Sequence, residues 1–325
     1  MTKHYRILEG KLCESTAQDG NVILYVNPNE AERKMLINER KIDEHTLSSA
    51  LDPNELSRLE FEPEHAALII NRPRNYSSAD EFFFTVTSMG LFLFKESLVI
   101  VAQEELMPLE SHQVQRITSL PDLLLKLLYR TTLHYLEHLK IMNMIADSLE
   151  DKIQHSMENR HLLNLFTLEK SLVYYQNSIH SNGVAIDKMK ANAIRMGFTL
   201  ENMEYVDDLI IENAQCYRQA EIYSNIFASL MDARVSIVNN NLSVLIKRLT
   251  MINIVFLPLN FLAGVGGMSE FSMMTAGIPW WVSYAGFFGA MLCIAGITYS
   301  IIRRFSGENN VRRRRKQKGE RGSRP

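Results

Sequence analysis

Polar side chains recur at heptad spacing in an otherwise apolar stretch near the C-terminal end of the chain. Asn253 and Asn260 lie seven residues apart, and Asn239 lies two heptads before Asn253. A seven-residue repeat keeps one face of a helix turned toward the common axis of a helix bundle. Small, hydroxyl-bearing and aliphatic residues fill the steps of three and four between them. The predicted face, called the polar stripe below, comprises Asn239, Ser243, Ile246, Leu249, Thr250, Asn253, Leu257, Asn260 and Gly264.

The side chains of the polar stripe have the chemistry of a cation pathway. Amide oxygens can replace the water contacts of a passing cation, and aliphatic rings at Ile246, Leu249 and Leu257 can close a pore by excluding water. Polar side chains are costly in lipid unless they face protein or water. Asn253 and Asn260 could instead only join helices by hydrogen bonds, but the repeat of Asn with Thr and small residues favours a pore. Two spans cannot enclose a pore, so an oligomer is predicted.

Two uncharged runs are long enough to place the stripe in a membrane. Residues 249–266 contain no charge, nor do residues 280–302, and both match the length of a helix that crosses a hydrocarbon core of ~30 Å. Lys and Arg flank the pair of runs, at 247–248 and 303–304, whereas the connection 267–279 has one Glu and neither Lys nor Arg. The positive-inside rule therefore predicts that both termini are cytoplasmic.

The average composition hides an uneven distribution of charge. The chain of 325 residues has a formal net charge of −2 and is 46% hydrophobic, which excludes collagen-like and wholly disordered classes. Residues 303–325 carry a net charge of about +8, so the remainder carries about −10. Next to a membrane span, a basic tail indicates contact with anionic lipid rather than nucleic acid. Three widely spaced cysteines form no CxxC pair, which excludes a disulfide framework or zinc knuckle.

The elements before the first span are predicted to be cytoplasmic. Residues 1–120 have the pattern of an α/β domain, with helical patches around 30–58, and residues 121–200 that of a helical hairpin whose second helix ends near Gly197. Residues 201–248 continue without proline or glycine into the first span, which predicts one long stalk helix. Strands are predicted at Val22–Val26, Ala66–Ile70, Phe82–Thr87, Leu91–Phe94 and Leu98–Val101.

A zinc-protease-like motif occurs in the predicted hairpin. His134, Glu137 and His138 match the H-x-x-E-H pattern of some zinc enzymes. That chemistry also needs a third ligand and a catalytic cleft, and neither is identifiable in the sequence. The match is therefore attributed to chance in a helix rich in charged residues and Leu, and the protein is not predicted to be an enzyme.

The C-terminal part of the chain resembles the CorA magnesium-channel family of the two-transmembrane GxN superfamily, which also includes the ZntB zinc transporters. The specific part of the resemblance is 243–304, beginning with the run LTMINIVFLPLNFLAGVGGMSEF and continuing through the second span. The resemblance implies an α+β cytoplasmic domain, a long stalk helix and two transmembrane helices, 249–266 lining the pore and 280–302 outside it. It also implies a funnel-shaped homopentamer in the bacterial inner membrane, with 267–279 in the periplasm and the tail 303–325 in the cytoplasm.

The family signature Gly-Met-Asn is changed in this chain. Gly267, Met268 and Ser269 occupy the matching positions. In the family the asparagines ring the entrance and hold a cation with its water shell, as suits Mg²⁺, which dehydrates reluctantly. A serine ring would hold the hydrated ion less firmly, and Asn260 could take over part of that role. Glu270 follows, and copies of it would make an acidic mouth.

The resemblance also implies that acidic residues sense cytoplasmic Mg²⁺. Asp207 and Asp208 match the position of one regulatory ligand, and Glu212 lies one turn along. Asp232 lies on the same helix face as the polar stripe, on the predicted cytoplasmic side of the membrane, and could attract cations. The alternative for all four residues is an ordinary solvated charge.

The predicted function is passive transport of divalent cations driven by the membrane potential. Two charges gain about 4.6 kcal/mol per 100 mV, so no ATP site is needed, and no GxxxxGK[ST] sequence occurs. Mg²⁺ is the first candidate, with Zn²⁺, Co²⁺ or Ni²⁺ as alternatives. Two other hypotheses stay open: a ZntB-like Zn²⁺ transporter, and a non-conducting membrane-anchored sensor or structural homologue. The cation is transported or regulatory cargo, and no cofactor is predicted.

Overall fold

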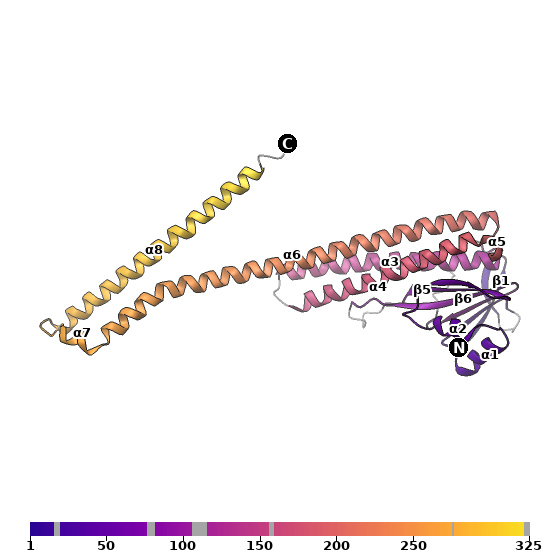
Figure 1. Ribbon diagram of the computed structural model, residues 1–325, viewed down its shortest axis with the longest axis horizontal. Helices are drawn as coiled ribbons and strands as arrows, with labels where there is room; N and C mark the ends of the chain where they lie inside the picture. The colour runs from indigo at the N-terminus through magenta and orange to yellow at the C-terminus, as the bar shows by residue number, and fades with distance from the viewer. Residues whose placement is uncertain (16–19, 77–81, 106–115, 156–158, 275, 322–325) are drawn as a thin grey trace. The chain divides into compact units, whose positions relative to one another are not determined.

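A computed structural model describes residues 1–15, 20–76, 82–105, 116–155, 159–274 and 276–321. The chain divides into two compact units, Met1–Asp232 and Ala233–Pro325, and each is described by itself. In the first unit a sheet packs against helices on both faces (Figure 1). The second unit consists of helices.

The described residues of the first unit contain a seven-stranded sheet in the order β2-β1-β3-β7-β6-β5-β4. Neighbouring strands are antiparallel except β3 and β7, which are parallel. The strands are β1 (Thr2–Leu8), β2 (Lys11–Ser15), β3 (Val22–Val26), β4 (Arg58–Phe61), β5 (His65–Pro73), β6 (Val86–Phe94) and β7 (Leu98–Ala102).

Both faces of the central strands are buried, which explains their nearly continuous apolar sequences. Along β5, Ala67 and Ile69 pack with α1 (Glu30–Asn38) and α2 (Glu44–Ser49) in one cluster. Leu68 and Ile70 point to the opposite face, where they pack with α3 (Leu120–His155) and α4 (Asn159–Ala191). This two-residue alternation is the normal geometry of a strand, and it gives the first unit a helix–sheet–helix layering.

Of the five strands predicted from the sequence, four lie within observed strands and one is misplaced. Val22–Val26 is β3, Leu98–Val101 lies within β7, and Ala66–Ile70 lies within β5. The predicted strand Phe82–Thr87 is wrong, because only its last two residues belong to β6, which runs on through the predicted Leu91–Phe94.

The chain leaves the sheet before β6 for a physical reason. Phe82 has a φ of 69°, which no extended strand tolerates. The side chain of Phe84 is buried among the helices and stacks on Tyr76, with 4.1 Å between the ring centroids. The backbone N–H of Phe84 donates to the Ser171 hydroxyl of α4 at 3.0 Å.

The predicted helices are present, and the second of them is interrupted near its end. α4 ends at Ala191, and a short α5 (Ala193–Met196) completes the segment. Gly197 follows in the left-handed conformation with a φ of 69° and closes α5, as expected of a helix-terminating glycine. The prediction of a stop near Gly197 is confirmed.

One helix, α6 (Leu200–Gly266), runs for 67 residues without a break. Thr199 and Asn202 cap its start reciprocally: the Asn202 N–H donates to the Thr199 hydroxyl at 3.3 Å, and the Thr199 N–H donates to the Asn202 amide oxygen at 3.2 Å. The part of α6 in the first unit is anchored by Cys216 and Phe227, which are fully buried among α3 and α4. The predicted continuous helix is confirmed.

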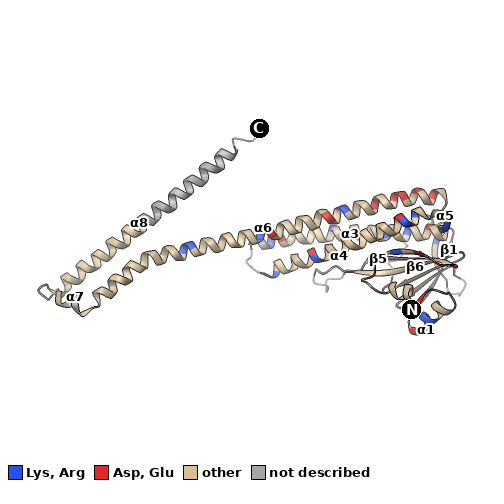
Figure 2. Ribbon diagram, in the orientation of Figure 1, with Lys and Arg blue, Asp and Glu red and all other residues tan. Residues whose placement is uncertain are grey.

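The second unit contains the remainder of α6, a short α7 (Ser269–Met274) and α8 (Trp280–Arg321). Among the described residues, two helices are long and apolar enough to cross a membrane, with spans inside Leu200–Val265 and Trp280–Ser300, and none of the apolar window is buried in either. Lys247 and Arg248 are the last charged residues of α6, and Figure 2 shows no charged residue on the stretch of α6 next to α7. Exposed apolar helices of this length fit lipid as the solvent.

A buried polar joint ties the sheet to α4. The Asn182 amide oxygen accepts from the Asn71 N–H at 3.0 Å and from the Ser57 hydroxyl at 2.6 Å, and the Asn182 amide nitrogen donates to the Asn71 carbonyl at 2.7 Å. Asn182 is 4% exposed. Its side chain therefore completes the edge of β5 where β4 has ended.

Replacing Asn182 by leucine should destabilise the first unit. The variant leaves the buried backbone N–H and C=O of Asn71 unpaired, and each unpaired group lowers the free energy of unfolding by about 1–3 kcal/mol. We expect a thermal midpoint several degrees lower for the full chain in detergent. The midpoint can be followed by thiol-dye labelling of buried Cys216 in a Cys13→Ser, Cys293→Ser background. Asn177→Leu is the matched control, because Asn177 is exposed on the same helix; equal midpoints for the two variants would contradict the role of the joint.

Candidate functional site

All nine residues of the polar stripe lie on α6, and all nine side chains are exposed. At 3.6 residues per turn they fall within about a third of the helix circumference. The predicted common face therefore exists on the observed helix.

The polar groups of the stripe differ in how they are satisfied. The Ser243 hydroxyl donates to the Asn239 carbonyl at 2.9 Å, and the Thr250 hydroxyl donates to the Ile246 carbonyl at 2.8 Å. Hydroxyls commonly bond back to the helix in this way. By contrast, the side-chain amides of Asn239, Asn253 and Asn260 make no hydrogen bond to any described part of the chain. These amides are available to water, to a cation or to another chain.

Pro258 lies inside α6 between the two asparagines of the apolar run. Proline has no N–H, so the carbonyl of Ile254 loses its helical donor. Figure 1 shows that α6 curves before it reaches α7. A bend near Pro258 can move Asn260 closer to its neighbours or farther from them while the rest of the helix stays intact.

The Gly-Met-Ser segment forms the turn between α6 and α7. The Gly267 N–H donates to the Ala263 carbonyl at 3.1 Å, the Met268 N–H donates to the Val265 carbonyl at 3.2 Å, and Ser269 begins α7. The side chains of Met268 and Ser269 are exposed. The side chain of Glu270 lies outside the described residues. The three-residue signature is therefore accessible at the end of α6.

The four candidate regulatory carboxylates lie along the first half of α6. Asp207 pairs with Lys190 of α4 at 2.5 Å between Oδ1 and Nζ. Asp208 and Asp232 are exposed, and Glu212 is half-buried. Among the described residues of one chain, no three His, Cys, Asp or Glu side chains come together in a group that could hold a metal ion. A regulatory site at these positions would need ligands from another copy.

The H-x-x-E-H histidines lie inside the helical core of the first unit. His134 is 7% exposed and His138 is 5% exposed, and their ring centroids are 4.4 Å apart. His138 Nδ1 lies 2.7 Å from the Tyr175 hydroxyl. Burial lowers the pKa of each histidine to about 4, assisted at His134 by Arg72 and Arg130 and at His138 by His134. Both rings are therefore neutral at pH 7, and their observed neighbours are core packing partners.

A polar cavity in the first unit escaped the sequence analysis. Its volume is about 820 Å³, and its lining comes from segments between residues 27 and 178. No local motif connects those segments. The fold alone brings them together.

The chain was compared with known proteins. A model of the family described as CorA-like Mg²⁺ transporter protein matches residues 22–304. The cobalt/magnesium transport protein CorA of Methanocaldococcus jannaschii is 25% identical over 280 residues, which cover 83% of this chain and 86% of that protein.

Solved structures show the same fold. The complete structure of the CorA magnesium transporter from Methanocaldococcus jannaschii superposes with a TM-score of 0.76 at 22% identity, over 93% of this chain and 96% of that chain. The ZntB cytoplasmic domain from Vibrio parahaemolyticus superposes with a TM-score of 0.57 at 12% identity, over 73% of this chain and 98% of that domain. These likenesses agree with the mixed α/β unit, the long helix and the two apolar helices.

The buried histidines predict a loss of stability in acid. Because the folded-state pKa of His134 and His138 lies below the ordinary value of 6.5, the unfolded chain binds more protons between pH 6.5 and about 4. The two neutral histidines contribute fully to the free energy of unfolding above pH 6.5. As the pH falls to about 4, this contribution decreases by roughly 3 kcal/mol for each histidine. The thermal midpoint of a His134→Gln, His138→Gln variant should depend less on pH in this window than that of the parent. His180→Gln, at an exposed position of α4, should keep the parent slope.

Proposed function

The chain belongs to the CorA-like Mg²⁺ transporter family, and on that premise we propose that it is a homopentameric channel for Mg²⁺ whose pore is lined by the polar stripe of α6. Transport through it is passive and driven by the membrane potential. The chain lies in the bacterial inner membrane with both termini in the cytoplasm. One observation carries the proposal: unpaired amides recur on one face of the apolar stretch of α6, and no residue of that stretch is buried.

The energetics favour water or ions opposite that face. An amide left without a partner in hydrocarbon costs several kcal/mol, so lipid is a poor neighbour for Asn253 and Asn260. Copies of α6 around an axis turn the amides toward a common aqueous path, where their oxygens replace water around a cation. The aliphatic members Ile246, Leu249 and Leu257 alternate with them along the stripe and supply the constrictions that close the path.

The entrance is proposed to be the ring of Gly267, Met268 and Ser269, with Glu270 attracting cations to it. Serine presents a hydroxyl on a shorter side chain than asparagine. This ring is therefore wider or holds a hydrated ion less firmly, which weakens selection for the firmly hydrated Mg²⁺. For this reason Co²⁺, Zn²⁺ and Ni²⁺ are the alternative substrates. A ZntB-like transporter of Zn²⁺ is the second candidate function.

Gating is proposed to depend on the carboxylates of α6. Asp207, Asp208 and Glu212 would bind cytoplasmic Mg²⁺ together with groups of a neighbouring copy, and Asp232 would draw cations toward the inner end of the stripe. Loss of the bridging ion leaves like charges facing each other, and their repulsion loosens the closed state. Lys190 already pairs with Asp207 and would compete with a cation for its carboxylate. Asp208 is therefore the more available ligand of the two.

Asn260→Leu should abolish flux while the oligomer persists. The substitution removes an amide from the stripe and adds aliphatic bulk at every copy. Uptake of Mg²⁺ into proteoliposomes, read with an enclosed cation-sensitive dye, should fall to the level of empty vesicles, with no change in the size of the assembly on gel filtration. Val255→Leu, on the opposite face of the same helix, should conduct like the parent. Parent-like flux in Asn260→Leu would remove Asn260 from the pore, and no flux in the parent would favour the non-conducting sensor.

Ser269→Asn should raise selectivity for Mg²⁺. The longer amide restores a firmer contact with hydrated Mg²⁺, and we expect the ratio of Mg²⁺ flux to Zn²⁺ or Co²⁺ flux to rise about tenfold, equivalent to about 1.4 kcal/mol. Ser269→Thr keeps the hydroxyl and should leave the ratio unchanged. Measuring Mg²⁺ and Zn²⁺ flux in the same vesicles, with and without a proton gradient, separates CorA-like from ZntB-like transport. An unchanged ratio in Ser269→Asn would show that selection occurs elsewhere.

A further inference from the structure

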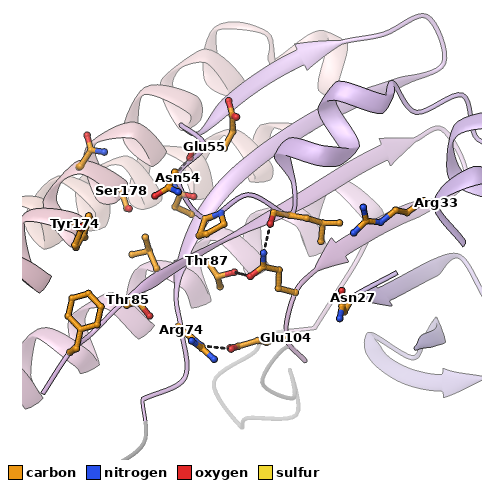
Figure 3. A pocket seen from close by; sticks show the side chains of 17 residues that line it. Asn27, Arg33, Asn54, Glu55, Arg74, Thr85, Thr87, Glu104, Tyr174 and Ser178 are labelled. Atoms are coloured by element: carbon orange, nitrogen blue, oxygen red, sulfur yellow. Dashed lines mark hydrogen bonds and ion pairs between the residues drawn. The ribbon is translucent and has the colours of Figure 1, made fainter. Parts of the chain in front are cut away.

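The polar cavity of the first unit lies at one end of the sheet, against α4 (Figure 3). Asn27 follows β3, and Gln103 and Glu104 follow β7. These two strands are parallel neighbours, and the Asn27 N–H donates to the Ala102 carbonyl at 2.8 Å. In α/β folds, ligands bind outside the carboxyl ends of parallel strands. The volume of about 820 Å³ is in the range of small-molecule sites, about 300–1,000 Å³.

One side of this cavity is aromatic and rich in amides. Tyr174 and Phe83 lie edge to face with their centroids 6.4 Å apart, and both rings are partly exposed. Asn54 and Asn177 line the cavity, and their amides make no hydrogen bond to any described residue. Aromatic faces stack on planar bases, and side-chain amides can bond bidentately to adenine.

The side of the cavity opposite Tyr174 carries the guanidinium group of Arg33 (Figure 3). Arg33 of α1 points into the cavity (Figure 3), and its Nε donates to the Pro28 carbonyl at 3.1 Å, which leaves the terminal nitrogens directed inward. The N-terminus of α1 is not available to an anion, because Glu32 already caps it. An anion here must therefore be held by side chains.

Of the two arginines that line the cavity, Arg74 pairs with a carboxylate, whereas Arg33 forms no ion pair with any described residue. Glu104 is shared by two arginines, with 2.6 Å between its Oε1 and Arg74 Nε and 4.0 Å between its Oε2 and Arg72 Nη2. Glu55, the other acidic lining residue, pairs with Arg58. The four charged lining residues, Arg33, Arg74, Glu55 and Glu104, sum to zero, and Glu104 already pairs with Arg74, so Arg33 is the lining guanidinium that remains for an anion. Guanidinium groups match phosphate oxygens bidentately.

We propose that this cavity binds a purine nucleoside phosphate, with the base against Tyr174 and Phe83 and the phosphate on Arg33. Figure 3 shows Tyr174 and Arg33 on opposite sides of the cavity, which matches the two ends of such a ligand. Asn71 of the buried joint also lines the cavity. The ligand would therefore contact both the sheet and α4 where Asn182 ties them together.

The proposal is tested by binding to the full chain in detergent. Fluorescence polarisation of N-methylanthraniloyl-ADP measures direct binding, and AMP, ADP, ATP and inorganic phosphate are added as competitors at constant Mg²⁺. We expect saturable binding of the probe and displacement by AMP at concentrations at least tenfold lower than by phosphate. No binding at millimolar nucleotide, or phosphate competing as well as AMP, would overturn the proposal.

Matched variants locate the site. Arg33→Ala should weaken binding at least tenfold, and Lys34→Ala, the next residue of the same helix, should change it less than twofold. Tyr174→Ala should weaken binding at least fivefold, and its exposed neighbour Val173→Ala should not. All four side chains are exposed, so the thermal midpoints should stay at the parent value. Equal effects of each variant and its control would place the nucleotide elsewhere and overturn the assignment.

Discussion

Two asparagine amides in the middle of an apolar helix determine what the second unit requires of its surroundings. Asn253 and Asn260 lie in a run that is long enough to cross a bilayer, and the described chain offers their side chains no hydrogen-bond partner. Burial of such groups in lipid is costly. The chain can avoid that cost only by placing the amides against water, ions or other copies of itself. An unbroken helix follows from this, because a break would rotate the two asparagines off the common face.

The same side-chain type behaves differently in the first unit, and the contrast is informative. Asn182 is buried, and both ends of its amide are bonded within the chain. Asn213 is also buried, and its amide nitrogen donates to the Ile179 carbonyl at 3.1 Å. Buried amides of the first unit thus find their partners inside a single copy. The unpaired amides of Asn253 and Asn260 lie in an apolar run, where water, ions or other copies would have to satisfy them, and this agrees with the proposed oligomer.

The sequence predicted those parts of the fold in which one strong local pattern dominates. α6 was predictable because residues 201–257 contain neither proline nor glycine, and the stop at Gly197 because glycine favours the left-handed conformation. The strands β1, β2 and β4 were missed because charged residues interrupt each of them. Phe82–Thr87 was misassigned because its aromatic residues suit a strand but pack on helices instead. The cavity could not be predicted, since its lining residues come together only through sheet pairing and the docking of α4.

A motif becomes a site only where its surroundings allow the chemistry, and two motifs of this chain illustrate the point. His134 and His138 match a zinc pattern, yet both rings are buried and pack against each other and against aromatic neighbours, and no third ligand joins them among the described residues. Gly264 and Gly267 lie near the proposed entrance, and within one chain neither needs to be glycine. A Cβ at Gly264 would meet no atom within 4 Å, and one at Gly267 would lie 3.5 Å from the Ala263 carbonyl oxygen, an ordinary contact. Neither glycine has a positive φ. In the proposed ring of copies, a methyl group added at either glycine would be repeated in every copy and would narrow the opening from all sides.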